Sequence, residues 1–296
     1  METNIVCFGE MLWDVLPTGK QPGGAPMNVA VHLKNLGHNP TMVSRIGRDD
    51  LGEELLDFVT QKGLSTHLIQ QGETHLTGVV KANVSDKNEV TYKIVHPVAW
   101  DYIQSNEALE AAVAHSDVLV YGSLAARSAT SAETLFRLLK KASFKVFDVN
   151  LRAPYYDSEL IKALLIEANM VKMNLQELDV IASWYGLGGD EELAVVRLAE
   201  LFDIQTICIT KGENGAMLWT KGQFYQSAGF QVEVKDTIGS GDSFLAALLT
   251  CLLQGKKTTE SLQFACAMGS LVATYRGATP FVTVSEIQSF LTPHLI

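Results

Sequence analysis

The residues with the clearest chemistry lie at positions 236–248, where the sequence reads DTIGSGDSFLAAL. Gly239 and Gly241 flank Ser240 directly before an apolar run that begins at Asp242, which indicates a loop that closes on the N-terminus of a helix. Glycine lets a ligand approach the backbone, and the free N–H groups at a helix start bind anions, phosphate above all. Asp242 would repel phosphate and could simply cap the helix. It also suits a base that takes a proton from a hydroxyl group as phosphate is transferred to it.

A second glycine-rich stretch, PGGAPMNVAVHLKNLG, occupies positions 22–37. Gly23 and Gly24 predict a tight loop, and the apolar residues that follow recur with helical spacing. This loop is neither a Walker A motif nor the GxGxxG dinucleotide fingerprint. On the first helical turn, the amide of Asn28 could both donate to and accept from a ligand hydroxyl, although such a residue is more often solvated. Asp14, which precedes a loop rich in proline and glycine, reads by itself as a turn residue.

Around these loops, strands and helices alternate along the chain. Compact apolar runs indicate buried strands, and the segments between them have helical periodicity. The pattern predicts one α/β domain over residues 1–296, with a mostly parallel central sheet and helices on both faces. The expected strands span residues 4–9, 41–47, 118–121, 145–149, 170–173 and 206–210, followed by a hairpin at 216–230, a strand-like run at 230–234 and helices at 242–254 and 259–275. Ligands of such sheets bind beyond the carboxyl ends of the strands, here near Gly9, Gly122, Asn150, Arg152, Asn174 and Lys211.

One segment departs from this alternation. Residues 77–84 and 90–95 are rich in β-forming side chains and are joined by SDKNE, which predicts a hairpin without helices around it. An all-β insertion in an α/β chain is a candidate lid, which we expect to be formed from about residues 10–17 and 67–100. An exposed lid edge would invite pairing with a second subunit, so we expect a homodimer formed through the lid.

Composition limits the classes of partner. Of the 296 residues, 47% are hydrophobic and 19% are charged, and the net charge is −10. This composition indicates a soluble globular protein and argues against a nucleic-acid or membrane-surface partner. The four cysteines lie far apart inside apolar runs, which favours reduced core thiols over a zinc site or disulfides. Without a signal peptide or a membrane span, we expect a cytoplasmic location.

Taken together, the two glycine loops resemble the two signatures of the PfkB, or ribokinase-like, family of sugar kinases. GGAPMNVA followed by Gly37 and Gly47 is similar to the first signature, and DTIGSGDSFLAALL is similar to the second. Within the family, WDVLPTGK, GGAPMNVA and DVNLR are most like fructokinases. The resemblance covers essentially the whole chain. It implies a ribokinase-like α/β fold with a small β lid, ATP and Mg²⁺ as cofactors, and a small-molecule sugar as the other partner.

The resemblance also implies residue roles on the sugar side. Asp242 matches the catalytic base, and the amides of Gly239, Ser240 and Gly241 match the anion hole for the transferred phosphate, in agreement with the chemistry of this loop. Asp14, Gly24 and Asn28 match the sugar-binding positions, which overturns the simpler readings of Asp14 and Asn28. Arg152 in DVNLR could meet a phosphate or a sugar oxygen, with a surface ion pair as the competing interpretation.

On the nucleotide side, Asn174 and Glu177 in NLQE match a motif linked to magnesium and the ATP phosphates. Magnesium usually keeps several waters, so contact with Glu177 through water is expected. The alternative is a capped helix start. Asp236 matches the acid of a monovalent-cation site for potassium, although Phe281 stands where some relatives offer a side-chain oxygen. Further residues that the resemblance assigns to ATP binding are Thr210, Gly212, Gly215, Ala267 and Ser270.

The leading hypothesis from the sequence is an ATP-dependent hexose kinase that makes fructose 6-phosphate from fructose. The alternatives within this chemistry are a ribokinase, a 2-keto-3-deoxygluconate kinase and a phosphosugar kinase. The last would need cations for the substrate's phosphate that the sugar-side loops do not obviously supply. A sugar-sensing protein without turnover is an alternative of another class, and a nicotinamide enzyme is disfavoured by the missing dinucleotide fingerprint.

Overall fold

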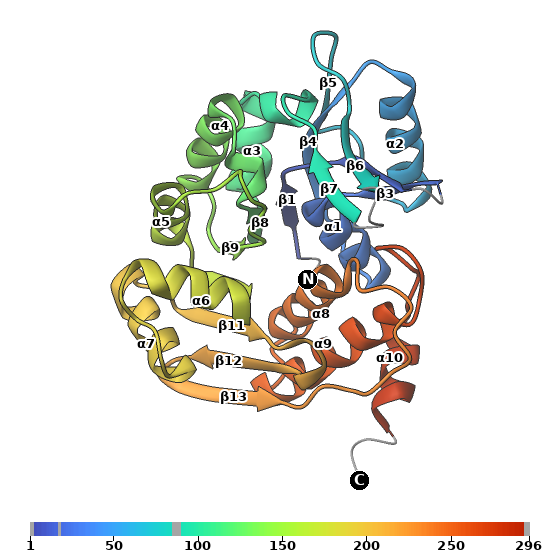
Figure 1. Ribbon diagram of the computed structural model, residues 1–296. Helices are drawn as coiled ribbons and strands as arrows, with labels where there is room; N and C mark the ends of the chain where they lie inside the picture. The colour runs from blue at the N-terminus through green and yellow to red at the C-terminus, as the bar shows by residue number, and fades with distance from the viewer. Residues whose placement is uncertain (1–2, 17–18, 85–89, 293–296) are drawn as a thin grey trace.

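The fold is built on one large sheet. The computed structural model describes residues 3–16, 19–84 and 90–292, and within these residues nine strands form a sheet in the order β13-β12-β11-β10-β9-β8-β1-β4-β5 (Figure 1). Neighbours from β5 to β11 run parallel, and β12 and β13 are antiparallel additions at one edge. The strands are β1 (Ile5–Phe8), β4 (Thr41–Gly47), β5 (Ile69–Gly72), β8 (Val118–Gly122), β9 (Lys145–Asp148), β10 (Met170–Asn174), β11 (Thr206–Thr210), β12 (Ala216–Thr220) and β13 (Gln223–Ser227).

Helices cover both faces of this sheet because successive strand residues point to opposite sides. In β1, Ile5 and Cys7 belong to one buried apolar cluster, while Val6 and Phe8 belong to the other. The first cluster packs against α1 (Ala25–Asn35), α2 (Asp50–Gln61), α8 (Ser240–Leu253), α9 (Thr258–Ala273) and α10 (Val284–Leu291). The second packs against α3 (Glu107–Ala114), α4 (Ala129–Leu139), α5 (Ser158–Glu167), α6 (Leu175–Trp184) and α7 (Glu191–Phe202). The predicted α/β class with a mostly parallel sheet is therefore confirmed.

A second, smaller sheet stands beside the large one. It has the order β3-β2-β6-β7 and comprises β2 (Leu12–Leu16), β3 (Gly19–Gly23), β6 (Gly78–Val84) and β7 (Val90–Ile94). This corrects the extent expected for the β insertion, because residues 19–23 belong to it, whereas β5 pairs with β4 in the large sheet. The SDKNE connection lies outside the described residues.

The strand expected at residues 230–234 is absent from the described structure, where this stretch is irregular. After β13 the chain leaves the sheet and returns to the start of α8. On the way, the amides of Lys235 and Asp236 donate to the Ala273 carbonyl at the end of α9, at 2.9 and 3.3 Å, and not to a strand. Phe230, Val232 and Val234 alternate with polar residues, which is the pattern of a half-buried strand, although the backbone here forms none.

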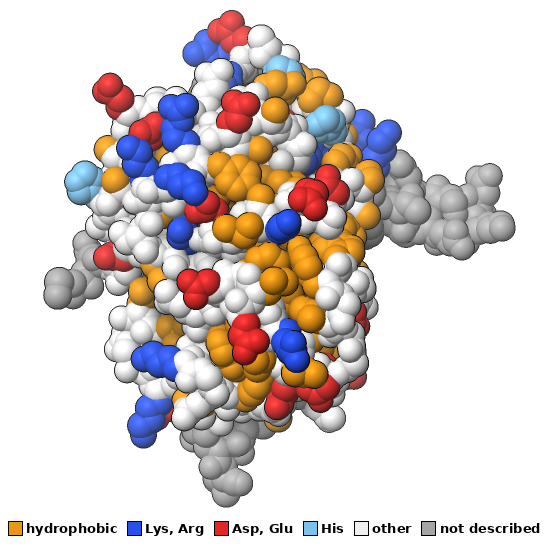
Figure 2. All heavy atoms as spheres, turned by 90° about the vertical axis from the view of Figure 1, so that its left-hand side faces the viewer, with side chains coloured by type: hydrophobic (Ala, Val, Ile, Leu, Met, Phe, Trp, Pro, Cys, Tyr) orange, Lys and Arg blue, Asp and Glu red, His pale blue; other side chains and the backbone are white. Residues whose placement is uncertain are grey.

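The distribution of charged side chains on the surface and the burial of the cysteines agree with what the composition predicts. On the face that carries α4, α5 and α7, basic and acidic side chains are interspersed with small groups of hydrophobic ones (Figure 2). All four cysteines are buried, and none of them is paired within the described chain. None of the helices in the described ranges has both the length and the apolar character needed to cross a bilayer.

Candidate active site

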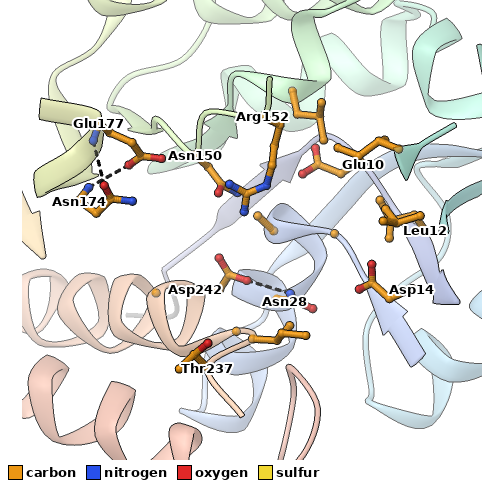
Figure 3. A pocket seen from close by; sticks show the side chains of 18 of the residues that line it. Glu10, Leu12, Asp14, Asn28, Asn150, Arg152, Asn174, Glu177, Thr237 and Asp242 are labelled. Atoms are coloured by element: carbon orange, nitrogen blue, oxygen red, sulfur yellow. Dashed lines mark hydrogen bonds between the residues drawn. The ribbon is translucent and has the colours of Figure 1, made fainter. Parts of the chain in front are cut away.

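A cavity of about 410 Å³ lies where the carboxyl ends of the central strands meet the start of α8 and the small sheet (Figure 3). It brings together residues that are far apart in the sequence but that the sequence analysis singled out. The predicted site residues that line it are Asp14, Gly24, Asn28, Arg152, Asn174, Glu177, Thr210, Gly239, Gly241 and Asp242.

The start of α8 has the geometry of an anion-binding turn. Gly239 is the N-cap residue with φ 77°, and a Cβ there would lie 2.2 Å from the Ala278 carbonyl oxygen, so only glycine fits. Both donors of Ser240 are already engaged within the protein. Its Oγ donates to the Gly269 carbonyl at 2.9 Å, and its amide donates to the Thr237 carbonyl at 3.2 Å. The amides of Gly241 and Asp242 lie in the first turn, where N–H groups have no acceptor within the helix. These two amides are therefore the best placed to bind an anion.

Asp242 sits on this turn as a buried, oriented carboxylate. Asn28 Nδ2 on α1 donates to Asp242 Oδ2 at 2.8 Å. Burial and the charge of Asp148 raise the pKa of Asp242 to about 6, against the lowering effects of Lys172, Asn28 and Arg152. Asn28 Oδ1 is buried without a partner among the described residues and is free to accept from a ligand hydroxyl. The pair can thus orient a hydroxyl group and take its proton.

A further acid, which the sequence analysis missed, lies beside this pair. Glu10 is 3% exposed and lies two residues after Phe8, the last residue of β1. The backbone amides of Glu10 and Ala25 favour its ionised form, but Oε2 has no partner in the described part of the chain. Burial raises its pKa to about 7. Its position next to Gly9, which was expected at a ligand-binding strand end, is the signal that could have identified it.

The rest of this side of the cavity combines polar and apolar surfaces. Asp14 on β2 is half-buried, and burial raises its pKa to about 6. A Cβ at Gly24 would lie 2.3 Å from the Glu10 carbonyl oxygen, so glycine is required where α1 approaches β1. The opposing apolar wall is formed mainly by the small sheet, and it consists of Leu12, Val80, Ile94 and Leu124. Such a cavity suits a ligand with hydroxyl groups on one side and C–H groups on the other.

Arg152 reaches into the cavity from the loop after β9 (Figure 3). Its Nη1 donates to the Leu151 carbonyl at 3.0 Å. Among the described residues it makes no ion pair, so the surface ion pair considered from the sequence is not found. After burial, which is the dominant influence, its charge is the main effect that lowers the pKa of Asp14.

Asn174 and Glu177 form the capped helix start that the sequence left open as an alternative. Asn174 Oδ1 accepts from the Glu177 amide, and Glu177 Oε2 accepts from the Asn174 amide, both at 2.9 Å. Glu177 Oε1 accepts from the Leu151 amide at 2.8 Å, which ties the Arg152 loop to α6. With both oxygens engaged, Glu177 fits contact with a metal through water better than direct ligation. No group of three or more His, Cys, Asp or Glu residues that could hold a metal ion occurs within the described ranges.

A second cavity of about 520 Å³ adjoins the first at the start of α8 and shares Asn174, Thr210, Thr237 and Gly241 with it. Its walls include Gly212, Gly215 and Ser270, which the sequence assigned to ATP binding. Phe230, Val232 and Phe244 line it as well. The glycines have no side chains and therefore leave space beside the apolar side chains. This combination suits a flat aromatic ligand.

Ala267 requires a correction, because it is fully buried and lines neither cavity. The faces of α9 explain this. Cys266, Gly269, Ser270 and Ala273 line the second cavity, whereas Ala267 belongs to the apolar cluster between α9 and the sheet.

Asp236 lies in the loop before α8, and its carboxylate accepts hydrogen bonds from two backbone amides. Its Oδ1 accepts from the Ile238 amide at 3.0 Å, and its Oδ2 accepts from the Gly277 amide at 3.1 Å. These bonds join the loop that precedes the anion-binding turn to the loop after α9.

Lys172 is a second lining residue that the sequence analysis missed. It lies on β10, and its Nζ pairs with Asp148 Oδ1 of β9 at 2.9 Å. A lysine inside the apolar strand sequence MVKMN was the available signal, because charged residues are almost never buried without a partner.

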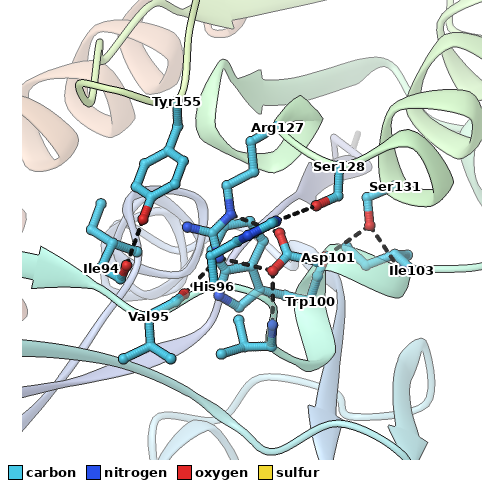
Figure 4. Close-up of polar contacts among 11 residues, drawn as sticks. Ile94, Val95, His96, Trp100, Asp101, Ile103, Arg127, Ser128, Ser131 and Tyr155 are labelled. Atoms are coloured by element: carbon cyan, nitrogen blue, oxygen red, sulfur yellow. Dashed lines mark hydrogen bonds and ion pairs between the residues drawn. The ribbon is translucent and has the colours of Figure 1, made fainter.

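The small sheet is attached to the large one by a buried cation (Figure 4). Arg127 binds the Asp101 carboxylate through Nε and Nη2 at 2.7 and 2.9 Å, and its Nη2 also donates to the Val95 carbonyl at 2.8 Å. Tyr155, three residues after Arg152, donates from Oη to the Ile94 carbonyl at 2.7 Å. The end of β7 is thereby fixed to the loop that carries Arg152.

Comparisons with known proteins identify the family and agree with the fold. A model of the pfkB family of carbohydrate kinases matches residues 2–284. A probable fructokinase of Arabidopsis thaliana is 28% identical, over 98% of this chain and 93% of its own length. A fructokinase of Escherichia coli is also 28% identical, over 94% of this chain and 95% of its own. The structure of a Xylella fastidiosa fructokinase with bound ATP matches the fold over 100% of both chains, with a TM-score of 0.87 and 24% identity.

Proposed function

Because the chain belongs to the pfkB family of carbohydrate kinases, we propose that it transfers the γ-phosphoryl group of ATP to a hydroxyl group of a hexose, converting fructose to fructose 6-phosphate. The observation that carries this proposal is the buried Asp242 on the first turn of α8, held by Asn28 at 2.8 Å beside a hydroxyl-binding cavity. A base and an anion-binding turn lie on the same four residues, 239–242. This is the combination that phosphoryl transfer to a neutral hydroxyl requires.

In the proposed reaction, Asp242 takes the proton of the sugar hydroxyl. The hydroxyl oxygen forms a bond to the γ-phosphorus, the bond from this phosphorus to the bridging oxygen breaks, and the electron pair leaves with ADP. The amides of Gly241 and Asp242, with that of Gly239, stabilise the charge on the transferred group. Magnesium bound with the ATP phosphates would neutralise further charge, with Asn174 and Glu177 as the residues that meet its waters.

The sugar is proposed to bind on the Asn28 side of the α8 start and the nucleotide on the Gly212 side. Unpartnered acceptors on Asn28 and Glu10, together with the Asp14 carboxylate, suit several adjacent hydroxyl groups. The first cavity is lined by two cations, Arg152 and Lys172, of which Lys172 is paired with Asp148, and by four acids, Glu10, Asp14, Glu177 and Asp242. This charge balance favours a neutral sugar over a phosphosugar. The identity with relatives that are named fructokinases supports fructose in particular.

Three finer features belong to the same proposal. The small sheet acts as a lid that closes on the sugar through Leu12, Val80 and Ile94, and its exposed edge pairs with a second copy of the chain. Asp236 helps to hold a potassium ion beside the anion-binding turn. The protein acts in the cytoplasm on small molecules.

The test is ADP release with ATP and magnesium against fructose, ribose, glucose, 2-keto-3-deoxygluconate and fructose 6-phosphate. We expect fructose to have the highest kcat/KM, and Asp242→Asn to lower kcat by about 10²- to 10⁴-fold because the base is lost. Asp179→Asn, an exposed aspartate on α6, is the matched control and should be fully active. Another leading sugar would overturn the fructose assignment, and sugar binding without ADP release would point to a sensor.

A further inference from the structure

A buried ion pair lies below the anion-binding turn. Lys172 and Asp148 are register partners on the parallel strands β10 and β9. Lys172 Nζ lies 2.9 Å from Asp148 Oδ1, and the side chains are only 10% and 5% exposed. The second carboxylate oxygen, Asp148 Oδ2, has no partner in the described structure. The carboxylate is therefore engaged only from the lysine side.

The ammonium group points toward α8. Strand residues alternate between faces, and Met170 belongs to the cluster on the α8 side whereas Val171 belongs to the opposite one. Lys172 follows the direction of Met170. Its Nζ is 3.1 Å from the point where a Cβ of Gly241 would stand, so it lies directly against the backbone of the anion-binding turn.

Stability alone gives little reason for this pair. Removing two charges from water is costly, and well-packed apolar residues of similar volume often serve a core as well or better than a buried ion pair does. The neighbouring positions on both strands are apolar: Val146, Phe147, Val171 and Met173 are all buried. A function that needs a positive charge at this position would explain why Lys172 and Asp148 interrupt these apolar strands.

The charges of the cavity indicate that function. Asp242, Glu177, Glu10 and Asp14 all line the space into which the proposed reaction brings a phosphoryl group. Burial lowers the pKa of Lys172, but the carboxylates of Asp148, Asp242 and Glu177 outweigh this effect and raise it, so the ammonium stays charged. A fixed ammonium beside the Gly241 amide offsets the repulsion between Asp242 and the incoming phosphate.

We propose that Lys172 is a further catalytic residue, whose ammonium group contacts the transferred phosphoryl group beside the Gly241 amide, and that Asp148 is the positioning residue that holds it there. This inference rests on the proposed kinase function. It adds a side-chain cation to the backbone amides of the anion-binding turn.

The position of Lys172 also affects the base. Four charged groups face Asp242: Asp148 on β9, Lys172 on β10, Arg152 in the loop after β9, and Glu10 after β1. Lys172 lowers the pKa of Asp242 and Asp148 raises it. Loss of the lysine should therefore move the acid limb of the activity profile to higher pH, and loss of the aspartate should move it to lower pH.

The experiment compares Lys172→Met, Asp148→Asn and the double variant Asp148→Asn with Lys172→Met. We expect Lys172→Met to lower kcat by about 10²- to 10³-fold, as the loss of one transition-state donor does, with the sugar KM little changed. The double variant removes both charges, so it leaves no unpaired buried ion and should fold, yet it should stay as inactive as Lys172→Met. Lys145→Met is the matched control, because this lysine pairs with Glu167 at the opposite end of β9 and should not affect catalysis.

Nucleotide binding without sugar separates this inference from the proposed function. Calorimetric titration with ATP and with ADP should show that Lys172→Met weakens ATP binding about 10-fold more than ADP binding, because a charge-assisted hydrogen bond to the last phosphate is lost. This result would support Lys172 even if the wild-type protein phosphorylated none of the tested sugars. Recovery of activity in the double variant, or equal losses for ATP and ADP, would overturn the proposal and leave a structural ion pair.

Discussion

At the scale of single residues, the ionisation of Asp242 sets the pH range of the proposed reaction. The ordinary pKa of 3.8 is raised to about 6, first by burial and then by Asp148. The base must be ionised to accept a proton, so activity is present above this pKa and is lost as pH falls through it. We expect kcat/KM to fall about tenfold per pH unit below about pH 6 and to level off above it.

The measurement is a profile of kcat/KM for the best sugar between about pH 5 and about pH 8, with thermal unfolding monitored at each pH. A profile that stays flat down to about pH 5 would mean that the limiting base has an ordinary carboxyl pKa. Such a profile would contradict the assignment of the buried Asp242 as the catalytic base.

The site residues differ in how well the sequence could identify them. Gly239, Gly241 and Asp242 could be identified because loop, helix start and acid are adjacent in the chain. Glu10 and Lys172 could not be identified in this way, because their environment comes from other elements: Ala25 approaches Glu10, and Gly241 approaches Lys172. Burial of a titratable group is a tertiary property, and a single sequence reveals it only through an unexpected charge in an apolar run.

At the scale of elements, α8 offers a test of the anion-binding turn. Gly239 at its start and Gly255 just after its end have similar φ angles, +77° and +70°. An alanine at either position costs roughly 1–2 kcal/mol in the left-handed region. Only at Gly239 would the new Cβ also meet a backbone atom, the Ala278 oxygen, at 2.2 Å, whereas nothing lies within 4 Å of it at Gly255.

We therefore expect Gly239→Ala to lower kcat by about 100-fold or more, because the turn must shift and its N–H groups would no longer point at the transferred phosphoryl group. Gly255→Ala should lose stability through the left-handed strain alone and keep kcat within about twofold of wild type. Urea unfolding and steady-state kinetics of both variants provide the comparison. Equal losses of kcat would show that the turn does not need its present geometry.

The elements themselves were largely predictable, since helical and strand periodicity placed every strand from β8 to β13 close to its observed bounds. The failures have physical causes. The segment GKQPG of β3 has two glycines and a proline and lies at a sheet edge, so its sequence resembles a turn. Phe230, Val232 and Val234 alternate with polar residues as in a strand, but they line the second cavity and form no strand.

At the scale of the whole molecule, the site reduces the stability of the fold at neutral pH. In the folded state, burial raises the pKa of Glu10 from 4.5 to about 7 and the pKa of Asp14 and Asp242 from 3.8 to about 6. The folded state thus binds more protons than the unfolded state between these values. The free energy of unfolding should therefore be highest near the unfolded pKa values and decline as pH rises through the folded ones.

Replacing Glu10 by Gln removes the ionisation but keeps the shape. We expect Glu10→Gln to raise the free energy of unfolding by about 3 kcal/mol at about pH 8 and by only about 1 kcal/mol at about pH 5. Urea denaturation at the two pH values measures this difference. Glu133→Gln, an exposed glutamate on α4, is the control and should show no pH-dependent gain. Stabilisation of the same size at both pH values would assign the gain to packing.

The attachment of the small sheet has a thermodynamic consequence. Its strands β2 and β3 connect directly to the cavity residues Glu10 and Gly24, and Tyr155 and Arg127 hold the end of β7 to the loop of Arg152. In the proposed function, closure of this sheet over the sugar and the shape of the cavity would be two descriptions of one conformational equilibrium. By reciprocity, a sugar that favours the closed population must bind more tightly whenever something else favours closure. A partner that seats on the outer edge of the lid would thus tune sugar affinity without touching the sugar.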